Sequence, residues 1–133
     1  WDRYFHSKLA NSVFSYGLHE KLRAQGSAVK AIDAHPGSSA TSLPDHLNGG
    51  AIFDFVITYV LGPMFQTAED GAMGILKGMM ATTAESGVLY GPTGMGGMRG
   101  PAVIIKPKKH ENDPESIKML WETSEKATDT KFL

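Results

Sequence analysis

Residues 4–11 read Tyr-Phe-His-Ser-Lys-Leu-Ala-Asn, and the interpretation of the whole chain starts from this stretch. Tyr4 and Lys8 are four residues apart, so on a helix they lie on the same face, one above the other. A phenol titrates near pH ~10, which is too high for ready proton exchange at neutral pH. A neighbouring ammonium favours the phenolate and lowers that pKa, and the first turn of a helix adds positive potential. A tyrosine placed in this way can act as a general acid or base.

Composition limits the classes of protein to which the chain can belong. The chain has 133 residues, 41% hydrophobic and 20% charged, which is typical of one soluble globular domain. The net charge of -1 gives no electrostatic reason to expect binding to nucleic acid or to an anionic membrane. The absence of cysteine excludes disulfides, thiolate catalysis and Cys-based zinc sites, and we predict no metal site. It is also compatible with a reducing compartment such as the cytoplasm or an organelle interior.

The first half of the chain predicts a helix followed by a strand. Apolar residues at helical spacing predict a helix over residues 4–25, with Gly26 as its stop and with Tyr16 and His19 on its surface. Residues 28–34 predict a strand that contains an unexplained Asp33. This order favours an α/β fold with a parallel sheet, in which ligands bind beyond the carboxyl ends of the strands. The loop over residues 35–43 lies at such an end.

The second half predicts two further helices and two short strands. Helices are expected over about 68–84, with Thr67 as N-cap, and over 114–127, which Trp121 packs onto the rest. The methionine-rich stripe of the first of these helices is interpreted as core. Short strands are expected at 88–90 and 102–106. The glycine run between them lacks the helix that a phosphate-binding loop requires, so that function is rejected.

The apolar region around residues 51–65 has three open interpretations. It is too short, and too interrupted by Asp54 and Gly62-Pro63, to be a transmembrane helix. It could be a buried helix, a lid over an apolar substrate or a surface for a partner.

Taken together, four motifs resemble the C-terminal half of a short-chain dehydrogenase/reductase, and most closely its retinol dehydrogenase, WW-domain oxidoreductase and protochlorophyllide reductase-like branch. The resemblance covers nearly all of the chain in order. The four motifs are Tyr4-x-x-x-Lys8 followed by Leu9-Ala10-Asn11, His35-Pro36-Gly37 with Thr41, Thr67-Ala68-Glu69-Asp70-Gly71-Ala72, and a tail with Leu120-Trp121-Glu122 and Ser124-Glu125.

The resemblance implies a fold, a reaction and a set of site residues. The fold would be the C-terminal part of a Rossmann-like, doubly wound parallel sheet, incomplete on its own. Tyr4 would be the proton donor to a substrate carbonyl, and Lys8 would hold the nicotinamide ribose of NADP or NAD. The loop 35–43 would enclose the nicotinamide, through the residues His35, Pro36, Gly37 and Thr41. The apolar region 44–66 would be the substrate loop, which implies a hydrophobic alcohol or carbonyl substrate.

The family's glycine-rich dinucleotide motif and its catalytic serine would lie upstream of Tyr4, so we expect the N-terminus to be a cut edge. The chain would then need its own N-terminal half or other protein chains as partners. Two alternatives to the enzyme remain open: a non-catalytic, dehydrogenase-like structural subunit of a larger assembly, and a module that docks on a protein or membrane through residues 51–65.

Overall fold

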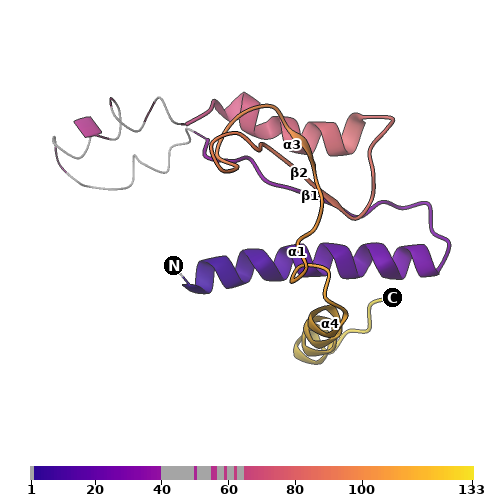
Figure 1. Cartoon of the computed structure of the whole chain (residues 1–133). Helices are drawn as coiled ribbons and strands as arrows, with labels where there is room; N and C mark the ends of the chain where they lie inside the picture. The colour runs from indigo at the N-terminus through magenta and orange to yellow at the C-terminus, as the bar shows by residue number, and fades with distance from the viewer. Residues whose placement is uncertain (1, 40–49, 51–54, 57–58, 60–61, 63–64) are drawn as a thin grey trace. The chain divides into compact units, whose positions relative to one another are not determined.

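The computed structural model describes residues 2–39, 50, 55, 56, 59, 62 and 65–133 (Figure 1). In this part of the chain, helices and strands follow one another in the order α1, β1, α3, β2, β3, α4. The strands form one three-stranded mixed sheet with the spatial order β1-β2-β3. The predicted α/β class is therefore confirmed, and the described residues form part of a Rossmann-like fold rather than a complete doubly wound sheet.

The sheet is built from three short strands. They are β1 (Ile32–Ala34), β2 (Val88–Gly91) and β3 (Val103–Ile105). Gly87 N donates to Ala31 O over 2.9 Å, and His35 N donates to Tyr90 O over 3.0 Å. Residue numbers therefore rise together along β1 and β2, as in a parallel pair.

The predicted strand over 28–34 is too long, because only residues 32–34 are extended in the sheet. Ala31, just before the strand, is bound instead to the segment that leads into β2. The Ser86 hydroxyl accepts a hydrogen bond from Ala31 N over 3.0 Å, and Gly87 N donates to Ala31 O. A side-chain hydroxyl thus takes the place of a ladder partner at the start of β1.

The chain divides into two compact units. The first contains Trp1–Asp33, Glu85–Leu89 and Ile105–Leu133, and the second contains Ala34–Ala84 and Tyr90–Ile104. The first unit holds the helices α1 (Asp2–Ala24) and α4 (Pro114–Thr128). The second unit holds the helix α3 (Ala68–Met80).

In the first unit, α1 and α4 meet around Trp121, as the sequence predicts. Trp121 is 6% exposed, and its ring stacks on Phe14 and Phe132 at centroid distances of 5.2 and 5.7 Å. Its indole nitrogen donates to Phe132 O over 3.0 Å. Gly17 lets the helices approach closely, because a Cβ there would lie 2.7 Å from Ile117 Cγ2. The core of this unit therefore depends on a large aromatic residue and a glycine that leaves room beside it.

The predicted surface positions of Tyr16 and His19 on α1 are wrong. Tyr16 is buried, with only 5% of its surface exposed, and His19 is partly buried. His19 Nδ1 lies 2.8 Å from Ser86 Oγ, so the imidazole is bound to the segment before β2. Both side chains lie on a face of α1 that the apolar stripe alone did not identify.

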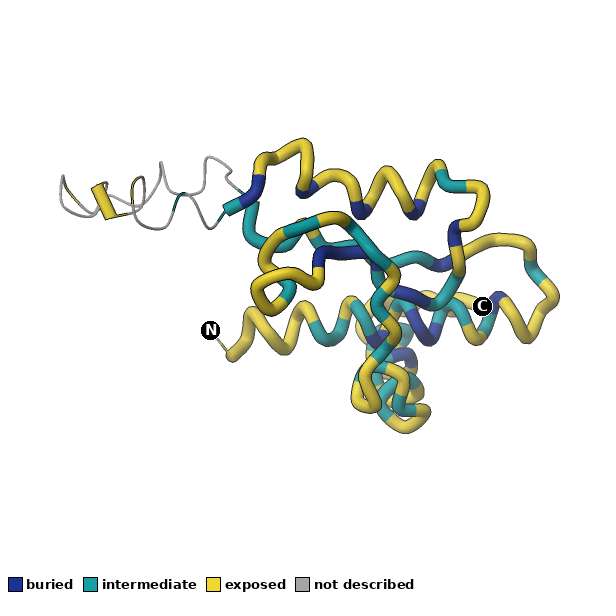
Figure 2. Tube along the Cα trace, turned by 45° about the horizontal axis from the view of Figure 1, so that its top comes forward, coloured by how far each residue is buried: buried dark blue, intermediate teal, exposed yellow. Residues whose placement is uncertain are grey.

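In the second unit, α3 buries glycines and exposes its apolar side chains, which contradicts the prediction that its methionine stripe is core (Figure 2). The buried residues are Gly71, Gly74 and Gly78. A Cβ at Gly74 would lie 2.9 Å from the backbone oxygen of Tyr90, which is 1% exposed. The helix therefore approaches the chain at Tyr90 with its backbone. The large apolar side chains that remain exposed are Met73, Ile75, Leu76, Met79 and Met80.

The ends of the helices are close to those predicted, except for the end of α3. The Thr67 side chain caps α3 by accepting from Asp70 N over 3.1 Å, and Asp113 caps α4 by accepting from Ser116 N over 2.9 Å. However, α3 ends at Met80 rather than near residue 84, because Ala81 is already extended, with ψ 129°. Thr82 and Thr83 follow, and β-branched residues favour a helix less.

Most of the apolar region 51–65 lies outside the described residues, so its predicted role is untested. Three of its side chains are described and exposed: Phe55, Val56 and Tyr59. The rings of Phe55 and Tyr59 lie 5.0 Å apart. None of the helices that the structure describes has the length and hydropathy needed to cross a membrane.

We predict that Trp121→Ala lowers the free energy of unfolding by about 3 kcal/mol, because it leaves a cavity and removes two ring contacts. Urea unfolding followed by circular dichroism measures this loss. The control is Met119→Ala at an exposed position of α4, where a change within about 0.5 kcal/mol is expected. Equal losses in the two variants would contradict the packing described for Trp121.

Candidate functional site

Tyr4 and Lys8 lie next to each other in the first turns of α1. The Lys8 ammonium is 5.3 Å from the centroid of the Tyr4 ring, as expected for residues four apart on a helix. Tyr4 is 53% exposed, and its ring packs edge-on against Phe5 at a centroid distance of 5.7 Å. The helix thus presents a phenol and an ammonium together on an exposed face.

The Lys8 ammonium has no hydrogen-bond partner among the described residues. It contacts the face of the Tyr4 ring, and its three donors remain available. An ammonium in this position fits a ligand with neighbouring hydroxyl groups, such as a ribose.

The second group of predicted site residues, His35, Pro36 and Gly37, directly follows β1. Gly37 N donates to His35 Nδ1 over 3.0 Å, which fixes the ring against its own backbone. Gly37 has a φ of +67°, a conformation that glycine adopts without strain. A Cβ at Gly37 would also lie 2.5 Å from Met98 O. Position 37 therefore requires a glycine for two reasons: the positive φ and the close contact with Met98.

Gln66 holds this turn from the side, and sequence reasoning missed it. Its side chain is 6% exposed, and its amide nitrogen donates to Pro36 O. Its amide oxygen accepts from Gly100 N over 3.0 Å. Its backbone nitrogen donates to Ser38 O over 2.9 Å. Gln66 therefore connects its own segment to residues 36–38 and to Gly100 within the second unit. No short motif in the sequence indicates this role.

A cavity of about 370 Å³ lies beside Gln66 and the start of α3. The first turn of α3 contributes polar groups to it, because Thr67 and Asp70 are both in the lining. The remaining lining residues are Phe65, Gln66, Met73, Arg99, Gly100 and Pro101. A ligand in this cavity would contact Gln66, whose side chain holds the turn at Pro36.

The predicted site residues therefore fall into two groups. Tyr4 and Lys8 belong to the first unit, and His35, Pro36 and Gly37 belong to the second. Thr41 lies outside the described residues, so its predicted contact with a cofactor stays a prediction. Within the described ranges, no three His, Asp or Glu side chains are placed to hold a metal ion.

Asp33, whose partner the sequence did not identify, is hydrogen-bonded to α1. Ser12 Oγ donates to Asp33 Oδ2 over 3.0 Å. A polar residue in a short strand is thereby satisfied by a helix that precedes it by about twenty residues in the sequence. A contact of this range leaves no local signal in the sequence.

Tyr16 is a second tyrosine on α1, and its chemistry differs from that of Tyr4. Burial raises the pKa of Tyr16 to about 12, and the negative charges of Glu111 and Asp33 act in the same direction. The Tyr16 phenol therefore stays protonated over the physiological range. It can donate a hydrogen bond, but it is unsuited to proton exchange.

The chain is similar to a curated protein, the short chain dehydrogenase/reductase dpmpH of Macrophomina phaseolina (strain MS6). The two are 28% identical over 126 residues, which is 94% of this chain. The chain spans 58% of the length of that relative. No protein-family model matches the chain, and no solved structure matches it. The similarity supports the short-chain dehydrogenase/reductase superfamily and does not distinguish its branches.

We predict that Gln66→Leu destabilises the turn at Pro36, because it removes two hydrogen bonds while keeping the side chain's approximate volume. The expected loss of unfolding free energy is about 1–3 kcal/mol, with faster hydrogen exchange at the Gly100 amide. The control is Gln25→Leu, since Gln25 is exposed just after α1. If the Gly100 amide exchanges at the same rate in both variants, Gln66 does not hold this turn.

We also predict that Tyr16 makes stability depend on pH at the alkaline end. The folded-state pKa is about 12, whereas an unfolded tyrosine titrates near ~10. The stability contribution of the neutral phenol is thus complete below about pH 10 and is lost as the pH rises toward 12. The difference in unfolding free energy between the wild-type protein and Tyr16→Phe, measured over this range, isolates the effect. A difference that does not vary with pH would contradict it.

Proposed function

We propose that this chain is the C-terminal part of an NAD(P)-dependent oxidoreductase of the short-chain dehydrogenase/reductase type. The observation that supports this most is the similarity to such a protein over 126 residues. In this chain, Tyr4 and Lys8 stand four residues apart, as the proposed chemistry requires. The four motifs of the sequence taken together are the basis for proposing the branch that includes retinol dehydrogenase, WW-domain oxidoreductase and protochlorophyllide reductase.

In this proposal, Tyr4 is the general acid. Its hydroxyl gives a proton to the oxygen of a carbonyl substrate, or takes one from an alcohol in the reverse direction. Lys8, 5.3 Å from the ring, stabilises the negative charge that develops on the Tyr4 oxygen as the proton leaves. The exposed position of both side chains lets a substrate and a cofactor reach them from solvent.

NAD or NADP, when bound, supplies the hydride chemistry. The three donors of the Lys8 ammonium fit the ribose hydroxyls, because no other described residue accepts a hydrogen bond from them. The loop 35–43 is the segment proposed to contact the nicotinamide, and Gln66 and Gly37 fix the shape of its first residues. The adenine-binding half would come from a part of the protein that precedes this chain.

The substrate in this proposal is a hydrophobic alcohol or carbonyl compound. Region 44–66 is proposed as the substrate loop, since the stretch 51–65 within it is strongly apolar. Three of its described side chains, Phe55, Val56 and Tyr59, are exposed, as expected of residues that contact a ligand or a partner.

One observation favours a second candidate, a non-catalytic dehydrogenase-like subunit of a larger assembly. The apolar side chains of α3 are exposed rather than buried, and exposed apolar patches often mark protein contacts. Such a subunit would retain Tyr4 and Lys8 without binding a dinucleotide.

The test uses the complete protein from its natural source, or produced at its full length, with NADPH and NADH and a panel of hydrophobic aldehydes and ketones. We predict that Tyr4→Phe lowers turnover by about 10²–10⁴-fold, as the loss of a general acid does, while the Kd for NADPH changes little. Lys8→Ala weakens NADPH binding by about tenfold or more, because a charge-assisted hydrogen bond is lost. Lys126→Ala, an exposed lysine of α4, is the control and leaves both quantities unchanged.

NADPH fluorescence separates the two candidates without a known substrate. An oxidoreductase changes the fluorescence of NADPH on binding, and Lys8→Ala weakens that response. If the wild-type protein leaves the fluorescence unchanged, the structural subunit becomes the better description. Full turnover in Tyr4→Phe would remove Tyr4 from the mechanism.

A further inference from the structure

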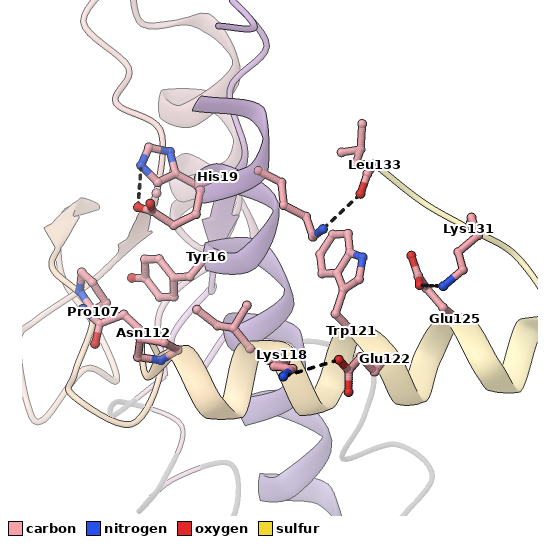
Figure 3. A pocket seen from close by; sticks show the side chains of 15 residues that line it. Tyr16, His19, Pro107, Asn112, Lys118, Trp121, Glu122, Glu125, Lys131 and Leu133 are labelled. Carbon is pink, nitrogen blue, oxygen red and sulfur yellow. Dashed lines mark hydrogen bonds and ion pairs between the residues drawn. The ribbon is translucent and has the colours of Figure 1, made fainter. Parts of the chain in front are cut away.

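The first unit contains a cavity of about 880 Å³ with a buried hydroxyl group in its lining (Figure 3). The hydroxyl belongs to Tyr16, which is 5% exposed. Its oxygen has no hydrogen-bond partner among the described residues. In Figure 3 the Tyr16 side chain projects from α1 on the side where Pro107 and Asn112 lie. A volume of this size is within the usual range for small-molecule pockets, roughly 300–1,000 Å³.

An unpartnered buried hydroxyl is unusual, because nearly all buried polar groups in proteins are hydrogen-bonded. Its neighbour His19 shows the normal situation, since its Nδ1 lies at hydrogen-bond distance, 2.8 Å, from Ser86 Oγ. Tyr16 faces no such partner and remains a neutral phenol, because burial disfavours its ionisation. It therefore offers a hydrogen-bond donor to whatever enters the cavity.

The other walls of the cavity determine what kind of molecule fits. Ile117, Trp121, Pro107 and Pro114 provide apolar surface. The charged lining residues are paired, because Lys118 lies 3.9 Å from Glu122 and Lys131 lies 2.7 Å from Glu125. Lys21 donates to the backbone oxygen of Leu133 over 3.0 Å and stands over the Trp121 ring. Charges that are paired in this way do not select for an ionic ligand.

We propose that this cavity binds a small neutral molecule with an apolar body and one hydrogen-bond acceptor, which accepts the hydrogen bond of Tyr16 Oη. The proposal is independent of the oxidoreductase function, because Tyr4, Lys8 and the turn at Pro36 line no part of this cavity. It gives α1 a binding role at Tyr16 in addition to the role proposed for its first turns.

The probe for this site is N,N-dimethylbenzamide, a neutral aromatic amide that accepts hydrogen bonds, donates none and is no substrate for hydride transfer. Isopropylbenzene is the matched hydrocarbon without the acceptor. NMR titration of the full-length protein is expected to show binding of the amide. Tyr16→Phe should weaken amide binding by about tenfold, as the loss of one hydrogen bond to a fixed donor does. It should leave hydrocarbon binding unchanged.

Tyr59→Phe is the control variant, because Tyr59 is exposed and lies outside the cavity lining. It should bind both probes as the wild-type protein does. In the absence of probe, Tyr16→Phe should melt no lower than the wild-type protein, since the hydroxyl it removes has no partner. A lower Tm would show that a segment of the complete protein already satisfies Tyr16, and this would overturn the proposal.

Two further outcomes decide the matter without relying on the variant. Intermolecular nuclear Overhauser contacts from the probe's methyl groups to the Tyr16 ring and the Ile117 methyls would place the amide in the cavity of the wild-type protein. If the wild-type protein does not bind the amide, the proposal is overturned. Loss of NADPH binding with retention of this probe site would contradict only the oxidoreductase function.

Discussion

Both units of this protein depend on the close approach of other groups to a helix at a glycine. In α1, Gly17 leaves space for Ile117 and Trp121, and in α3, Gly74 faces the backbone oxygen of Tyr90. In each case a Cβ on the glycine would lie less than 3.0 Å from a neighbouring atom. This constraint decides which face of each helix is buried. The buried face of α3 is consequently a row of glycines, and its apolar side chains remain exposed.

The glycine packing also affects the residues proposed for chemistry. In the first unit, contact between α1 and α4 anchors the middle of α1, while its first turns, which carry Tyr4 and Lys8, are exposed. In the second unit, the turn at Pro36 and Gly37 is held by Gln66 and by close contact with Met98. The residues proposed for chemistry thus lie at the ends of well-packed elements.

Two tyrosines on one helix have opposite surroundings. Tyr4 stands beside the Lys8 ammonium on an exposed face. Tyr16 is buried near Glu111 and Asp33, where a negative charge on its oxygen is disfavoured. Tyr4 is the residue proposed for proton transfer, and Tyr16 is the residue proposed as a fixed hydrogen-bond donor. Because α1 carries both, one helix can serve two different sites.

The sequence by itself determined the α/β class, the caps of α3 and α4, the packing role of Trp121 and the adjacency of Tyr4 and Lys8. These features rest on interactions between residues a few positions apart or on strong local periodicity, which a linear pattern records. Only the tertiary structure decided that Tyr16 is buried, that Ser12 binds Asp33, that Gln66 joins three segments and that α3 packs through its glycines. Each of these depends on contacts between segments that are distant in the sequence, such as Ser12 with Asp33 and Gln66 with Gly100, so the local sequence pattern could not indicate which face of a helix is buried.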